Sequence, residues 1–237
     1  MENNLEIFGG IGVIIAIFIV VNLLVIYLFK DRRVSFLTSL SSMILIISNI
    51  ISVKEINFIG LSLPVSVFIY PLIFACVLAI CKLKGAKDAV KSIVCIVLTQ
   101  LVFTMFICIT GLIFNPNANG TIGHNNLISI FGSTPMDTFK VALSSIVTFF
   151  VSGTITVLLF EYIKKHVYDI LGLLLALIIG LSIDAALFTI LTINTKVDLI
   201  NVVMSKLVIH TAYSFVLAFL YYVLIVNNKV KKSKTKK

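Results

Sequence analysis

The sequence predicts an all-α protein that crosses a membrane repeatedly, a polytopic bundle of about seven transmembrane helices. Of its 237 residues, 59% are hydrophobic and only 12% are charged, whereas soluble proteins have about a quarter of their residues charged. The mean hydropathy is +1.14. The apolar residues also gather in runs of roughly 20, the length that crosses a ~30 Å hydrocarbon core. We therefore expect residues 1–237 to form one integral membrane domain.

Seven apolar runs are the predicted spans. The run near the N-terminus follows an acidic leader and precedes the charged residues 30–33, which favours a retained helix over a cleaved signal peptide. Residues 54–61 are predicted to form a tight turn between spans, and the longest connection, 115–137, carries Pro116 and Gly120 as turn signals. The predicted spans lie near residues 7–29, 34–53, 62–81, 90–114, 138–162, 168–193 and 203–226.

The placement of Lys and Arg predicts the orientation, because basic residues collect on the cytoplasmic side of membrane helices. Most of the 19 Lys and Arg residues fall in alternate connections and in the C-terminal tail, whereas connection 115–137 has none. We expect the N-terminus outside, the C-terminus inside, and 227–237 as a basic cytoplasmic tail, in a bacterial cytoplasmic membrane. The basic residues behind the net charge of +9 are then explained by their role in orienting the helices. We therefore expect no nucleic-acid partner.

Ionisable side chains inside the spans are candidate solute-binding residues, because a charge at the bilayer centre costs about 2.5–3.5 kcal/mol and needs a reason. Asp184 is the deep acid of the sixth predicted span. Lys206 and His210 lie four residues apart in the seventh, on one helix face. A cluster of these three side chains between the last two helices is therefore predicted.

Further polar residues lie toward the predicted outer half: Asn49, Lys54 and Gln100. Such groups suit a cavity for a flat, hydrogen-bonding solute. For Asn49 and Gln100, hydrogen bonds that hold neighbouring helices together are an equal alternative. The four cysteines show no CxxC spacing and the chain has three histidines, so no metal, disulfide or cofactor is expected. With no HExxH or GxSxG motif either, an enzyme is not expected.

An ordered set of short motifs runs from about residue 45 to 210. It begins with Asn49 and Lys54 as N-x4-K, and continues with G-L-S-L-P at 60–64, Y-P-L-I-F at 70–74 and a G-x3-A pair at 85 and 89. F-G-S-T-P at 131–135, Asp184-x3-Phe188 and Lys206 follow in order. This set resembles the queuosine precursor transporter family, also called the vitamin uptake transporter (VUT) family. Where that family usually carries membrane acids, this chain has Leu78, Lys82 and Thr156.

The resemblance implies a six-span core preceded by an additional N-terminal helix. It also implies a mid-membrane site for a modified nucleobase or vitamin-like solute, including a 7-deazaguanine queuosine precursor. Asn and Gln side chains would read the edge of such a heterocycle, and Asp184 would accept from its amine or ring N–H. Pro71 inside the third span is predicted to remove a backbone hydrogen bond and to create a kink that lines the cavity.

Three functions remain open at this point. The first is a permease that binds its small-molecule substrate in the bilayer through Asp184, Lys206 and His210. The second is a substrate-binding subunit of an ATP-driven vitamin uptake complex, whose ATPase would be another chain because no P-loop motif is present. The third is a non-transporting membrane sensor with the same fold. A second copy of the chain or an energising subunit is the expected protein partner.

Overall fold

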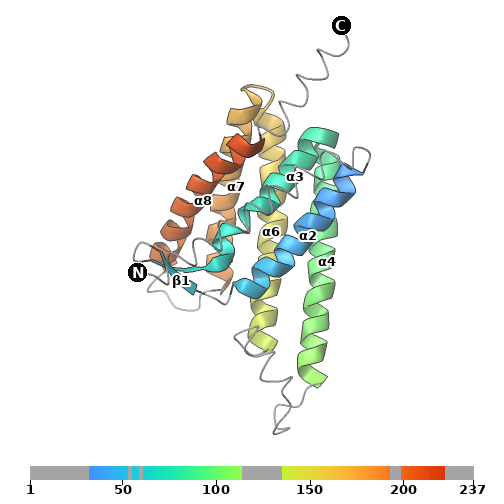
Figure 1. Ribbon diagram of the computed structural model, residues 1–237, viewed down its shortest axis with the longest axis vertical. Coiled ribbons are helices and arrows are strands. Elements are labelled where there is room, and N and C mark those ends of the chain that lie inside the picture. Colours follow the sequence, from blue (N-terminus) through green and yellow to red (C-terminus); the bar gives the residue numbers. More distant parts are fainter. Residues whose placement is uncertain (1–31, 53–54, 59–60, 114–134, 193–198, 222–237) are drawn as a thin grey trace.

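The computed structural model describes residues 32–52, 55–58, 61–113, 135–192 and 199–221, and its long elements are helices packed into a bundle (Figure 1). The elements are α2 (Arg33–Ile51), β1 (Glu55–Phe58), β2 (Leu61–Pro64), the 3-10 helix η1 (Val65–Phe68), α3 (Pro71–Lys84), α4 (Ala86–Ile113), α6 (Pro135–Ile163), α7 (Asp169–Thr192) and α8 (Leu199–Tyr221).

The helical membrane class is confirmed. Among the described residues, 5 helical segments are long and apolar enough to cross a membrane, and α8 adds a shorter apolar stretch, Val203–Ala218. These six segments overlap the last six predicted spans. The predicted first span, 7–29, and the predicted tail, 227–237, lie outside the described residues. The five long segments are Arg33–Ile51, Val65–Lys84, Ala86–Ile107, Phe139–Ile163 and Asp169–Thr192.

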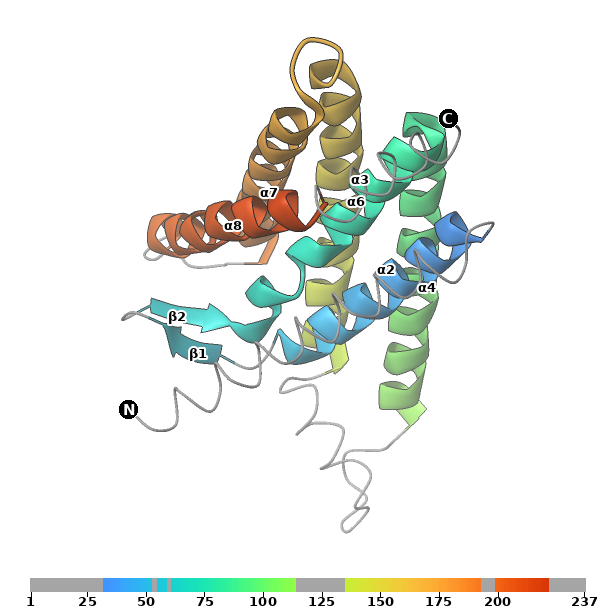
Figure 2. The same ribbon diagram turned by 45° about the horizontal axis from the view of Figure 1, so that its top comes forward.

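A short hairpin replaces the tight turn that was predicted for residues 54–61. Strands β1 and β2 pair antiparallel, with Glu55 opposite Pro64 and Phe58 opposite Leu61. The reason lies in the sequence: apolar and polar residues alternate through Glu55–Phe58 and again through Leu61–Ser62–Leu63, which is the two-residue period of a strand. The bundle is thus helical with one small hairpin, rather than purely α (Figure 2).

Helices α3 and α4 are joined by one residue, where a connection of several residues was predicted. Gly85 has φ +95°, a value that side chains disfavour and glycine adopts freely. Its N–H donates to the Cys81 carbonyl at 2.8 Å, and its own carbonyl accepts from Ala89 at 3.2 Å. The chain therefore turns from one helix into the next with both backbone groups of Gly85 paired.

Helix α3 is the central element of the bundle. In the segment Val65–Lys84, 78% of the most apolar stretch is buried inside the protein, against 28% in α4. Helices α7 and α8 lie on one side of α3, and α2 and α4 lie on the other (Figures 1 and 2). Phe74 of α3 packs edge-on against Phe149 of α6, with ring centroids 5.6 Å apart. α4 therefore lies at the periphery, where its apolar side chains face lipid.

Helices α6 and α7 approach each other most closely at a glycine. A Cβ atom added at Gly180 would lie 1.7 Å from the Thr156 hydroxyl and 2.9 Å from its Cβ. A small residue is what allows two membrane helices to pack at such a separation. The Thr156 hydroxyl at this contact is satisfied within its own helix, because it donates to the Ser152 carbonyl at 2.7 Å.

Candidate functional site: a solute cavity

The bundle has two chemically different ends. One, here called the basic end, comprises the start of α2, the turn between α3 and α4, and the turn between α6 and α7. Lys82 of α3 pairs with Asp169 of α7 there, and Lys164 pairs with Glu161 at 2.5 Å. The first of these ion pairs fastens two helices that are far apart in the sequence. The basic residues at this end are Arg32, Arg33, Lys82, Lys84, Lys87, Lys91, Lys164 and Lys165.

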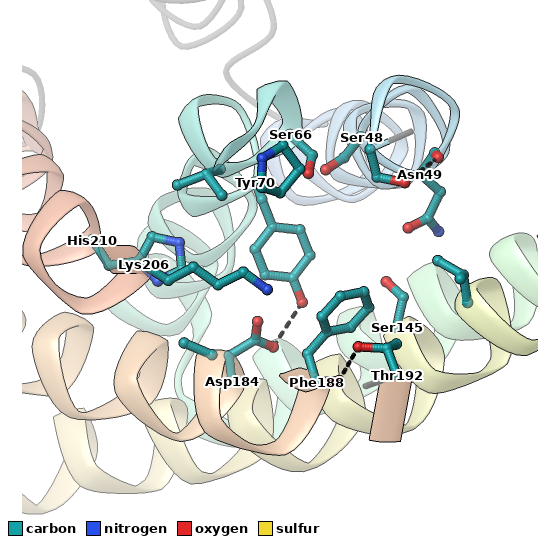
Figure 3. Close-up of a pocket in the computed structure, with 15 residues that line it drawn as sticks. Ser48, Asn49, Ser66, Tyr70, Ser145, Asp184, Phe188, Thr192, Lys206 and His210 are labelled. Atoms are coloured by element: carbon teal, nitrogen blue, oxygen red, sulfur yellow. Dashed lines mark hydrogen bonds between the residues drawn. The ribbon is translucent and has the colours of Figure 1, made fainter. Parts of the chain in front are cut away.

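A cavity of about 200 Å³, here called the solute cavity, lies in the opposite half of the bundle (Figure 3). It forms where the ends of α2 and α7 meet the starts of α6 and α8, with η1 and the residue before α3 between them. Its volume is below the ~300–1,000 Å³ typical of pockets for drug-sized ligands, so it suits a small solute. The residues that line it include Ser48, Asn49, Ser66, Tyr70, Ser145, Asp184, Phe188, Thr192, Lys206 and His210.

Asp184 of α7 is buried at the wall of the solute cavity. Two hydroxyl groups lie within hydrogen-bond distance of its Oδ1 atom, Tyr70 at 2.8 Å and Ser152 at 2.9 Å. The single Ser152 proton is shared between Asp184 and the Thr148 carbonyl, which is 2.7 Å away. Because both donors bind the same oxygen, Oδ2 is left for another partner. A buried carboxylate with two charge-assisted hydrogen bonds is held in one orientation. Asp184 is therefore preorganised to accept a hydrogen bond from a solute.

Lys206 of α8 reaches across the solute cavity toward Asp184 (Figure 3). Its Nζ lies 4.7 Å from the centroid of the Phe188 ring and 3.5 Å from the Thr189 hydroxyl. Among the ion pairs between described residues, none joins Lys206 to Asp184 within 4.0 Å. A buried ammonium held over an aromatic face, with a carboxylate across the cavity, leaves room for a solute that contacts both charges.

His210 and Asn49 add one unpaired polar atom each. His210 Nδ1 lies 3.4 Å from the Leu181 carbonyl. The neutral tautomer with its proton on Nδ1 donates to that carbonyl and leaves Nε2 as an acceptor. Nε2 of His210 and Nδ2 of Asn49 are buried without a hydrogen-bond partner among the described residues. A buried polar atom without a partner is costly in a native protein. A bound solute with matching groups would satisfy both.

The solute cavity thus offers two kinds of contact at its two ends. The charged end has the acceptor Asp184, the donor Lys206 and the acceptor His210, whereas the neutral end has the Asn49 amide and several hydroxyls. The rings of Tyr70 and Phe188 lie between the two ends (Figure 3). Such an arrangement can hold a flat molecule by its faces and read both of its edges. Among the described residues, no cluster of His, Cys, Asp and Glu could hold a metal ion.

The structure brings together four of the six predicted site residues: Asn49, Asp184, Lys206 and His210 all line the solute cavity. Gln100 does not. It is buried in α4, where its Nε2 donates to the hydroxyl of Thr104 in the same helix at 3.4 Å, so this bond does not join α4 to a neighbouring helix. Lys54 lies outside the described residues.

Pro71 is placed differently from the prediction of a kink inside a helix. It is the first residue of α3, after the 3-10 helix η1 has ended. A proline is favourable at that position because the first N–H groups of a helix have no intrahelical acceptor. The break before it still matters to the site, because it allows Tyr70 to point into the solute cavity.

Sequence reasoning missed Tyr70, Ser152 and Phe188 as residues of the site. Phe188 had a usable signal, since it follows Asp184 by four residues and therefore shares its helix face. Tyr70 and Ser152 had none, because they approach Asp184 from other helices, 114 and 32 residues away along the chain.

A model of the vitamin uptake transporter family matches residues 64–224. The match covers more than half of the chain. The protein belongs to this family. The match begins at the end of β2 and spans α3 to α8, so it includes most of the residues that line the solute cavity, from Ser66 to His210. A comparison with curated proteins and a comparison with solved structures found no match.

At the three positions where the resemblance implies membrane acids, this member of the vitamin uptake transporter family has two packed side chains and one ion-paired lysine. Leu78 is fully buried in the core around α3, and Thr156 is wedged against Gly180. Lys82 is held by Asp169 at the basic end. Asp184 is accordingly the carboxylate that lines the solute cavity among the described residues.

Proposed function

We propose that the protein is a permease that carries a small, flat, polar solute across a bacterial cytoplasmic membrane, with a modified nucleobase or a vitamin-like molecule as its substrate class. The observation that carries the proposal is the solute cavity, with Asp184, Lys206 and His210 at one end and Asn49 at the other. A 7-deazaguanine queuosine precursor fits this description, because its ring edge offers donors to Asp184 and acceptors to Lys206 and Asn49. No catalytic step is part of the proposal.

The orientation in this proposal is N-terminus out and C-terminus in, with seven spans. The basic end then faces the cytoplasm, and the solute cavity lies in the outer half of the bundle. Between the two lies the core of α3, α6 and α7, and the Lys82–Asp169 ion pair closes the cytoplasmic end. This arrangement corresponds to a state that receives solute from outside.

A second candidate function is a non-transporting sensor that binds the same solute. The observation that favours it is that Leu78 and Thr156, which stand where the family usually has acids, are committed to packing. One buried carboxylate suffices for binding, whereas proton coupling is commonly built from several acids in a chain. Binding with no transport would therefore indicate the sensor, or the substrate-binding subunit of an ATP-driven complex.

The test is uptake of a radiolabelled 7-deazaguanine precursor by cells that lack their own transporter, beside binding of the same compound to the purified protein. We expect accumulation with the natural sequence, and at least about a tenfold loss in Asp184→Asn and Lys206→Ala, because each removes a charge-assisted hydrogen bond. Lys87→Ala is the matched control: it removes an exposed lysine that does not line the solute cavity.

Each other result has a definite meaning. Binding to the purified protein without accumulation in cells would replace the permease by the sensor or subunit function. Neither binding nor accumulation, with the protein inserted in the membrane, would exclude the queuosine precursor as the substrate. If Lys87→Ala and Lys206→Ala lowered uptake equally, the solute cavity would not be the site through which the solute is transported.

A further inference from the structure

A second cavity lies at the basic end, between the starts of α2 and α4. It has a volume of about 530 Å³, and the residues that line it include Ser35, Thr38, Lys84, Asp88, Lys91 and Cys95. None of these residues lines the solute cavity. At its base Thr38 donates to the Ser92 hydroxyl at 3.0 Å, which joins α2 to α4. This second space, here called the basic-end cavity, has no role in the proposed transport step.

The charge of the basic-end cavity is positive. Lys84 and Lys91 carry two positive charges, and Asp88, 3.5 Å from Lys91, carries one negative charge. Lys84 is exposed, and no ion pair between described residues includes it. The Ser35 hydroxyl adds a donor beside the two ammonium groups, whereas the Thr38 proton is already used within the protein. A phosphate group matches this set, because it accepts hydrogen bonds from ammonium and hydroxyl groups together.

Below the basic-end cavity, two apolar stripes continue along the outside of the bundle. On α2 the exposed residues follow a four-residue spacing, from Ser35 in the cavity to Met43 and Ile47. On α4 the exposed residues run from Lys91 and Cys95, which line the cavity, to Leu98, which is 54% exposed. Residues at these spacings share a helix face. Each stripe therefore begins in the charged cavity and runs into the hydrocarbon region.

We propose that the basic-end cavity binds an anionic phospholipid of the leaflet at the basic end, with its phosphate between Lys84 and Lys91 and its acyl chains along the stripes of α2 and α4. A soluble anion would use the charged part alone, whereas a phospholipid uses both the charges and the apolar stripes. Basic pockets between membrane helices on the cytoplasmic side are suited to lipid headgroups. The lipid would hold α2 against α4 at the basic end.

The first test is native mass spectrometry of the whole protein from micelles that contain equal amounts of phosphatidylglycerol and phosphatidylcholine. We expect retained phosphatidylglycerol, and a loss of affinity by about tenfold or more in the double variant Lys84→Gln/Lys91→Gln. The matched control, Lys87→Gln/Lys165→Gln, removes the same charge at the same end from residues outside the cavity, and should retain the lipid. Lys84→Arg/Lys91→Arg should retain it as well. Equal losses in the two Gln variants would overturn the site.

The second test uses Cys95, the exposed thiol of the basic-end cavity. Its alkylation by a membrane-permeant maleimide is followed by peptide mapping, in nanodiscs of phosphatidylcholine with or without phosphatidylglycerol. We expect phosphatidylglycerol to slow the reaction severalfold in the natural sequence and to have no effect in Lys84→Gln/Lys91→Gln. An equal effect in both proteins would contradict the proposal. If inorganic phosphate protected Cys95 equally well in nanodiscs of phosphatidylcholine alone, the ligand of the basic-end cavity would be a soluble anion and not a lipid.

Discussion

At the residue scale, Asp184 owes its fixed position to two donors that share one oxygen. Tyr70, just before α3, and Ser152 of α6 approach its Oδ1 atom, so the carboxylate links α7 to α6 and to the start of α3. Hydrogen bonds to a charged group each contribute about 1.5–3 kcal/mol. The pair therefore both stabilises the bundle and aims the second carboxylate oxygen at the solute cavity.

Removing these donors one at a time tests whether they act together. Tyr70→Phe is expected to lower the free energy of unfolding by about 1.5–3 kcal/mol, because Asp184 keeps only the Ser152 bond. Ser152→Ala should cost a similar amount alone and more in the Tyr70→Phe background, since it then removes the last donor. The measurement is a double-mutant cycle of unfolding in mixed micelles. Strictly additive losses would mean that the two hydroxyls do not share the carboxylate.

The charged end of the site was predictable because its residues lie within one or two helices. The i, i+4 spacing of Lys206 and His210 puts both on one face, and Asp184 is the deep acid of the helix before. Gln100 shows the limit of this reasoning: it is buried, but it bonds to Thr104 of its own helix and does not line the solute cavity. Which way a polar side chain faces depends on the packing of whole helices, and a single span does not encode that.

At the element scale, the contact between α6 and α7 depends on the absence of a side chain at Gly180. Gly180→Ala is expected to destabilise the protein by about 1–3 kcal/mol, the usual cost of overpacking, because its methyl group would overlap Thr156. Thr156→Ala in the same protein should restore part of the loss by removing the hydroxyl and methyl groups. Thermal unfolding in detergent measures both effects.

Gly153→Ala on α6 is the matched control for Gly180→Ala. There the nearest atom to the new methyl group is the Ile93 side-chain tip at 3.4 Å, which can move aside. Its effect should be within about 0.5 kcal/mol. Comparable destabilisation by both substitutions would show that helix flexibility, rather than the contact with Thr156, sets the cost.

The helices themselves were largely predictable. A long apolar run that crosses a bilayer must pair its own backbone N–H and C=O groups, and a helix does so within one segment. The differences arise at short connections. The hairpin of β1 and β2 has an alternating pattern of only four residues in β1 and three in β2, and the Gly85 corner shortened the expected loop to one residue. At this length the signals of turn, strand and helix end overlap, and packing decides between them.

At the scale of the whole molecule, the Lys82–Asp169 ion pair joins α3 to α7 at the end of the bundle that lies away from the solute cavity. Breaking it in Asp169→Asn is expected to loosen α3 from α7. Cys81, 1% exposed and 3.6 Å from Glu161, should then react severalfold faster with a maleimide, as followed by peptide mapping. The exchanged pair Lys82→Asp/Asp169→Lys should restore slow labelling.

The control for this prediction is Lys91→Ala, which breaks an ion pair within α4 alone. Labelling of Cys81 should stay slow in that variant. An unchanged rate in Asp169→Asn would mean that the packed core of α3, rather than the ion pair, keeps this end closed.

The orientation of the whole chain is tested by cysteines placed at its two faces. With the C-terminus in the cytoplasm, Lys87→Cys should react with an impermeant maleimide only after cells are opened, and Asn119→Cys should react in intact cells. Both are compared with the natural sequence to subtract its own thiols. The reverse labelling pattern would show that the chain has the opposite orientation, with the solute cavity toward the cytoplasm.

The Gly85 corner also has a consequence for biogenesis. Because one residue separates α3 from α4, the two helices must enter the bilayer together as a hairpin while the chain is still being synthesised. α3 presents little surface suited to lipid once the protein is complete, yet α6, α7 and α8, which cover it, are translated later. α2, which is translated before α3, and α4, which follows it, are therefore the first partners of α3, and α3 stays beside them until α6, α7 and α8 are inserted.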